Sequence, residues 1–88
     1  MKHTKGEWKI FPISNKLIQI NSEKMYSIAY VWAINRELKE ELEANAKLIA
    51  AAPDLLEVLI KLKEWEKTNF IEQSLLEKIN NAINKATL

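Results

Sequence analysis

The chain has 88 residues, of which 48% are hydrophobic and 28% are charged. A chain of this length folds around one core, so we expect a single domain over residues 1–88. No apolar stretch approaches the roughly 18 to 20 residues of a membrane span, which predicts a soluble protein. The absence of cysteine excludes disulfides and thiolate chemistry, and a single histidine argues against a zinc site. We therefore expect no metal and no cofactor.

The net charge of +1 is distributed unevenly along the chain. Residues 1–36 hold six basic and two acidic side chains, a net charge of +4, whereas the remainder has a net charge of −3. The asymmetry places an anionic ligand, if there is one, at the N-terminal half. The alternative is that lysines and glutamates only solvate the surface. The small total charge argues against a domain that coats long nucleic acids.

Three segments of the first half have the composition of β-strands. Trp8–Phe11 ends at Pro12, Leu17–Ile20 ends at Asn21, and residues 25–34 are rich in aromatic and β-branched side chains. The two links between them are short and rich in turn residues. We therefore expect neighbouring strands to pair antiparallel as a meander.

The third segment has two dissimilar faces, because side chains alternate along a strand. One face is bulky and contains Tyr26, Ile28, Tyr30, Trp32 and Ile34, while the other contains Ser27, Ala29, Val31 and Ala33. Small side chains let a helix approach closely, so we expect the helices on that side. The rings would then need a cover, which could be a ligand, another subunit or part of the same chain. The alternative is that the rings form an ordinary core under the helices.

After residue 35 the chain becomes helical in composition. Asn35 can cap a first helix over residues 36–52, whose apolar stripe comprises Leu38, Leu42, Asn45 and Ile49. Pro53 disfavours helix at the preceding residue and predicts a bend there. A second stripe follows with Leu55, Leu59, Leu62 and Trp65.

A third helix is predicted where Asn69 and Glu72 have the spacing of a capping box, with Leu75, Ile79, Ala82 or Ile83, and Ala86 as its stripe. The fold class is therefore α+β: a three-stranded antiparallel β-meander followed by three α-helices.

The sequence contains no set of residues typical of an enzyme. Its single histidine lies in the terminal segment, and its single glycine excludes a glycine-rich phosphate loop. The acidic residues 37, 40, 41 and 43 lie together on the outer side of a predicted helix, so we interpret them as a solvated surface. We expect a protein that binds and does not catalyse.

Two residues suggest a binding role. Asn45 falls in the predicted apolar stripe, where an amide needs hydrogen-bond partners, either on the N-terminal strand or on a ligand. Trp8 lies between Lys5 and Lys9, an arrangement suited to stacking a base near its phosphates. Packing of Trp8 in the core or at an interface is the alternative.

Three segments of the sequence resemble a group of small phage and prophage proteins. His3-Thr4-Lys5-Gly6-Glu7-Trp8, Ile28-Ala29-Tyr30-Val31 and residues 44–57 correspond to H-T-x-G-x-W, I-A-x-V and A-N-A-x-L-I-A-A-A-P-x-L-L-E, in that order. The chain has Lys5 and Glu7 where the group often has proline, which predicts a less rigid N-terminal segment.

The resemblance implies a phage accessory protein of the infected host's cytoplasm. It also suggests overlap with anti-CBASS sponge proteins, which oligomerise and sequester cyclic dinucleotide immune signals without cleaving them. The nucleotide-binding residues implied by the motifs are His3, Thr4, Trp8 and Asn45, to which we add Lys5 and Lys9 on charge.

A competing hypothesis is a protein that inhibits a host protein through its aromatic sheet face. In either case we expect a homo-oligomer, with Tyr26, Tyr30 and Trp32 at the interface, because a small monomer cannot easily cover both sides of a sheet. A third hypothesis is that the aromatic face binds single-stranded nucleic acid, and the small net charge argues against it.

Overall fold

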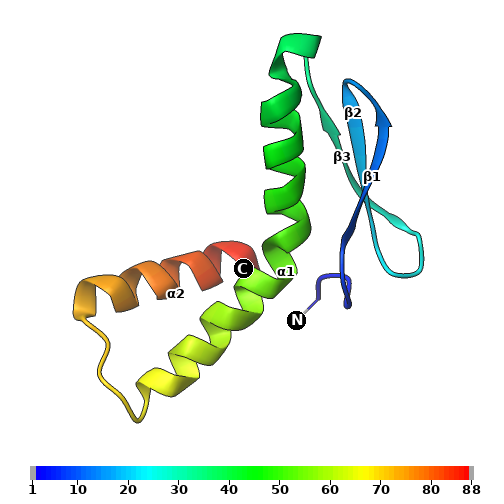
Figure 1. The fold of residues 1–88 in the computed structure, drawn as a ribbon. Coiled ribbons are helices and arrows are strands. Elements are labelled where there is room, and N and C mark those ends of the chain that lie inside the picture. The colour runs from blue at the N-terminus through cyan, green and yellow to red at the C-terminus, as the bar shows by residue number, and fades with distance from the viewer. Residues whose placement is uncertain (1, 88) are drawn as a thin grey trace. The chain divides into compact units, whose positions relative to one another are not determined.

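The computed structural model describes residues 2–87, apart from the side chain of Arg36. Its elements, in order, are strands β1 (Lys9–Ser14), β2 (Leu17–Asn21) and β3 (Ser27–Trp32), a short 3-10 turn η1 (Arg36–Leu38), and helices α1 (Lys39–Glu66) and α2 (Gln73–Thr87) (Figure 1). The chain divides into two compact units, one of His3–Pro53 and one that comprises Lys2 and residues 54–87. None of the described helices is long and apolar enough to cross a membrane.

The three strands form one antiparallel sheet in the order β1-β2-β3, which confirms the predicted meander. Phe11 pairs with Gln19, and Gln19 pairs on its other side with Tyr30. One row of side chains therefore crosses all three strands on the same face. Leu17 and Trp32 form the next row along that face.

Strand β1 continues through Pro12 to Ser14, so the prediction that it ends at Pro12 is wrong. The Ala33 N–H donates to the Lys16 carbonyl at 2.8 Å, so these two residues form a hydrogen-bonded pair between β2 and β3. Bonded pairs recur at every second residue, so the backbone N–H and C=O groups of Ile18 and Ile20 also point toward β3. Pro12 pairs with Ile18, so its nitrogen faces away from β2. An edge strand accommodates a proline in this position because no ladder hydrogen bond is lost.

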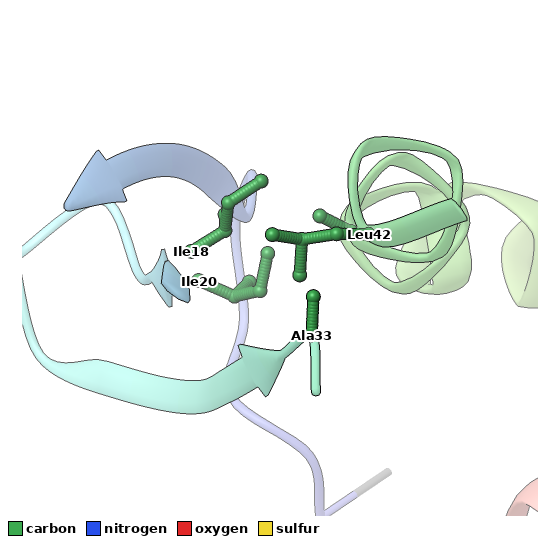
Figure 2. Packing of buried hydrophobic residues seen from close by; sticks show 5 residues of the cluster. Ile18, Ile20, Ala33 and Leu42 are labelled. Atoms are coloured by element: carbon green, nitrogen blue, oxygen red, sulfur yellow. The ribbon is translucent and has the colours of Figure 1, made fainter. Parts of the chain in front are cut away.

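The core of the sheet unit lies between the sheet and the first half of α1. Ile18, Ile20, Ala33, Leu42 and Ala46 are buried together, with Ile20 and Ala46 fully inaccessible to solvent. Leu42 points from α1 toward the two isoleucines and Ala33 (Figure 2). The helix thus covers the small-residue face of β3, as the alternation predicted.

Ile28 is an exception to the predicted alternation. The pairs Ile20 with Ala29 and Asn21 with Ser27 leave Ile28 as an additional residue in β3, a β-bulge. Ile28 packs against the core cluster. A bulge changes the alternation of the strand locally, so the prediction that Ile28 belongs to the aromatic face is wrong.

The prediction of three helices is also wrong, because the first two are one continuous helix. Asn35 does cap the start, since its Oδ1 accepts the Glu37 N–H at 3.0 Å. Residues 39–66 are then helical without interruption, with Pro53 inside the helix. Proline removes one intrahelical hydrogen bond, but strong helix formers on both sides, Ala50–Ala52 and Leu55-Leu56, offset this local cost. The described fold is therefore α+β with two α-helices.

The second unit contains the end of α1 and helix α2. Asn69 does not open α2: its Nδ2 donates to the Trp65 carbonyl at 3.1 Å and so closes α1. The Leu76 N–H donates to the Glu72 carbonyl at 2.9 Å, which makes Glu72 the residue that precedes α2. The predicted capping box of Asn69 and Glu72 is wrong because the amide satisfies a free carbonyl at the end of the preceding helix. Within α2, Ile79 is buried.

Candidate functional site

An uncovered aromatic surface lies on the side of the sheet opposite α1. Phe11, Tyr30 and Trp32, here called the aromatic face, are 54%, 54% and 70% exposed. The register places Phe11 and Tyr30 in one row across β2 and Trp32 in the next. These three side chains therefore form one surface built on hydrogen-bonded strands.

Tyr26 is also exposed, at 69%, but it lies in the turn before β3 and not in a strand. Ser22 holds this turn: its hydroxyl oxygen accepts the Tyr26 N–H at 3.0 Å, and its own N–H donates to the Tyr26 carbonyl at 2.8 Å. Met25 has a φ of 65°, a left-handed conformation that the tight turn requires. The predicted interface residues Tyr30 and Trp32 thus share the sheet face, with Tyr26 beyond the bulge.

The N-terminal segment brings three of the predicted nucleotide-binding residues together. The Trp8 indole N–H donates to the Thr4 carbonyl at 3.1 Å. The His3 ring meets the Trp8 ring edge-on, with centroids 6.4 Å apart and an interplanar angle of 77°. Trp8 is half-buried and packs against the core cluster, so the indole also has a structural role.

Glu23 holds the same segment against the turn that follows β2. Its carboxylate accepts the Glu7 N–H at 3.1 Å, a bond that a proline at position 7 could not make. Gly6 has a φ of +89°, and a Cβ at this position would lie 2.8 Å from the Glu23 carboxyl carbon. Glycine therefore allows both the left-handed backbone and the close approach of the carboxylate.

Asn45 does not lie on the buried stripe of α1. Its side chain is exposed, and the buried positions are Leu42 and Ala46. A step of four residues from Leu42 reaches Ala46, whose small side chain lets the helix approach the sheet. Asn45 consequently needs no buried partner, and the prediction that it faces the core is wrong. Lys5 and Lys9 are exposed, as is Thr4.

A cavity of about 410 Å³ lies between the first strands and the beginning of α1. Its apolar lining includes Ile10, Ile18 and Leu42. Its charged lining residues are Lys39, Glu43 and Lys47, and the Lys39 Nζ lies 3.9 Å from the Glu43 Oε1. None of the six predicted nucleotide-binding residues lines it. The cavity arises where strands pack against a helix, so no local sequence motif could predict it.

The charged side chains of the described residues include a surface ion pair in α1. The described residues contain no group of three or more histidine, cysteine, aspartate or glutamate side chains arranged to hold a metal. The pKa of Lys61 is raised, chiefly by its hydrogen bond to Glu57, with an Nζ to Oε1 distance of 2.9 Å. Both side chains are largely exposed, so this is a surface ion pair.

Comparison with known proteins places the chain in a protein family. A model of the family described as Salmonella phage P22 protein Y8K6 matches residues 1–87. No curated protein and no solved structure matches the chain. Because the match extends over nearly all of the 88 residues, the chain belongs to the phage family of Salmonella phage P22 protein Y8K6.

Proposed function

We propose that this phage protein acts in the host cytoplasm by binding a host protein through the aromatic face, without catalysing a reaction. The observation that carries the proposal is the exposure of Phe11, Tyr30 and Trp32 opposite the helix-covered side. Large exposed apolar patches mark interaction sites, and buried aromatic anchors supply much of the binding energy at protein interfaces.

The composition of the sheet favours a protein partner over a phosphate-containing one. Lys9 is the one charged residue within the three strands. Recognition of a phosphate backbone requires several cations close to the stacking rings. A partner with its own apolar surface matches the aromatic face better, because both surfaces would be removed from water together.

Affinity capture with matched variants tests this proposal. The bait is the purified protein, and the lysate comes from Salmonella cells, the host named in the family's description. Trp32→Asp places a charge on the aromatic face, whereas Phe70→Asp places one at an 87% exposed aromatic in the other unit. We expect a host protein that Phe70→Asp retains and that Trp32→Asp binds at least about 30-fold more weakly, the loss typical of a central aromatic anchor. Equal capture by Trp32→Asp and wild type would overturn the proposal.

Sequestration of a cyclic dinucleotide, the anti-CBASS sponge activity, is our second candidate. The arrangement that favours it is the cluster of His3, Thr4 and Trp8 beside the exposed Lys5 and Lys9. Asn45 is exposed on α1 and Trp8 packs against the core cluster, so part of the Trp8 ring is not free to stack on a ligand.

Calorimetry against a panel of cyclic dinucleotides and cyclic ADP-ribose isomers tests this second candidate. Lys9→Ala should weaken binding roughly 3- to 10-fold and reduce its salt dependence, since one phosphate contact is lost. Lys47→Ala, at the separate cavity, serves as the control and should bind as wild type does. No heat with any member of the panel would refute the candidate, and a hydrolysed product would contradict a sponge.

A further inference from the structure

The two edges of the sheet differ in how they are protected. At β1, Pro12, the register shift before Ser14 and the charge of Lys9 all hinder the addition of another strand. Strand β3 contains neither proline nor a charged residue, and residues 25–35 are an uncharged run of eleven. Its outer side has no strand partner among residues 2–87.

The hydrogen-bond pattern shows which backbone groups of β3 are available. The Ala33 N–H bonds to Lys16, and residues opposite each other on antiparallel strands alternate between bonded and non-bonded pairs. Val31 and Ala29 therefore direct their N–H and C=O groups toward β2. Tyr30 and Trp32 direct theirs outward, away from the sheet.

We propose that two copies of the chain associate by antiparallel pairing of β3 with β3, so that the sheets join into one of six strands. Tyr30 and Trp32 are two residues apart and both have outward backbone groups. In a two-fold arrangement, Tyr30 of each copy exchanges hydrogen bonds with Trp32 of the other. Val31 then lies opposite its own counterpart at the symmetry axis.

Side-chain chemistry also favours a second copy as the occupant of this edge. The pairing places the rings of Tyr30 and Trp32 from different copies directly opposite each other on the outer face, and such aromatic cross-strand pairs are stabilising. An uncharged edge meets itself without repulsion, and each copy offers the same surface, as a two-fold interface requires. The bulge at Ile28 lies before the paired residues and leaves Ala29–Trp32 regular. Because Phe11, Tyr30 and Trp32 lie on one face of the sheet, the pairing also joins the aromatic faces of the two copies into one surface.

Cysteine cross-linking tests the predicted register, since the natural chain has no cysteine. In the full-length protein, Val31→Cys places two thiols at a non-bonded pair, where the Cα atoms are about 4.5 Å apart, within the range of a disulfide. Ala29→Cys is the matched control on the same side of the strand. It lies four residues from its own counterpart along the paired strands, roughly 13 Å away, beyond disulfide reach.

We expect mild oxidation to convert most of the Val31→Cys protein to a covalent dimer and to leave Ala29→Cys monomeric on a denaturing gel. Equal cross-linking of the two variants, or none at Val31→Cys, would overturn the pairing. Light scattering of the wild type should give twice the chain mass of 10.2 kDa, and a monomer at every concentration would also overturn it.

A second pair of variants distinguishes pairing by the edge from stacking by the face. Tyr30→Pro removes an N–H that points outward, so no bond to β2 is lost, whereas Tyr30→Ala removes only the ring. Two hydrogen bonds disappear from each dimer, so the dissociation constant should be roughly 10- to 100-fold higher for Tyr30→Pro than for Tyr30→Ala. Equal dissociation constants would contradict the edge pairing. Circular dichroism establishes that both variants fold, and if Tyr30→Pro does not, the cross-linking result decides.

Discussion

A pair of substitutions at neighbouring positions of α1 tests how this helix faces the sheet. Ala46 has no solvent-exposed surface and packs in the cluster of Ile18, Ile20 and Leu42. Ala46→Leu adds three carbon atoms where there is no space, which typically costs about 1 to 3 kcal/mol of the free energy of unfolding. Asn45→Leu adds apolar volume at an exposed position, so its effect should be within about 0.5 kcal/mol. The higher helix propensity of leucine favours a small gain.

Equilibrium unfolding in urea, followed by circular dichroism, measures both effects. With a slope of about 1 kcal/mol per molar urea, Ala46→Leu should lower the unfolding midpoint by roughly 1 to 3 M. Asn45→Leu should leave the midpoint within about 0.5 M of the wild type. If Asn45→Leu destabilises the protein as strongly as Ala46→Leu does, then Asn45 faces the sheet and the packing described above is incorrect.

Three further changes test other parts of the fold. Gly6→Ala should lower the free energy of unfolding by about 1 kcal/mol or more, because alanine disfavours the positive φ and its Cβ would meet the Glu23 carboxylate. In a Glu23→Ala background, urea unfolding should show a smaller loss of stability from Gly6→Ala, because the carboxylate is absent. Pro53→Ala should raise the free energy of unfolding by about 1 to 3 kcal/mol by restoring a helical N–H, and a lower thermal midpoint would show that the proline is required. Glu57→Gln should return the raised pKa of Lys61 toward its ordinary value in an NMR titration. The stabilisation that comes with a raised lysine pKa is fully present at pH 7 and is lost only as the pH rises through the folded-state pKa. Both side chains of the pair are exposed, so this stabilisation is small and the unfolding midpoint at pH 7 should hardly change; a clear decrease would show that the ion pair matters to the fold.

The strands could be predicted from the sequence because their signals are local. Alternation in residues 25–34 identified the small face that α1 covers, and the short links identified the antiparallel order. The bulge at Ile28 could not be predicted, because it depends on the register with β2 and not on β3 alone. The continuation of β1 beyond Pro12 likewise depends on which side of the strand is free.

The helices were harder to predict because competing local effects had to be weighed. Proline often marks the end of a helix, yet the alanines and leucines beside Pro53 keep α1 continuous. Asn45 and Ala46 are adjacent, and the periodicity allowed either to fall on the stripe. Ala46 is the buried one of the two, because only the smaller side chain fits where the helix lies close to the sheet. Asn69 could cap either helix, and its bond to Trp65 shows that it closes α1.

The candidate site was only partly visible in the sequence. The alternation predicted the side of β3 on which Tyr30 and Trp32 lie, but not whether these rings are covered; both are exposed. His3, Thr4 and Trp8 lie together. The contribution of Phe11 to the aromatic face required the register between β1 and β3, which passes through Gln19. The role of Glu23 in holding the N-terminal segment involves a contact between residues sixteen apart, and no local pattern indicates such a contact.

Site-specific photocrosslinking in host cells tests whether the aromatic face binds a host protein. A benzophenone amino acid replaces Tyr30 in one variant and Phe70, the exposed ring of the other unit, in a second. After illumination, mass spectrometry identifies the cross-linked proteins. We expect the probe at position 30 to yield one defined host protein that the probe at position 70 does not. Identical cross-links at the two positions, or no host protein at position 30, would show that the aromatic face does not bind a host protein.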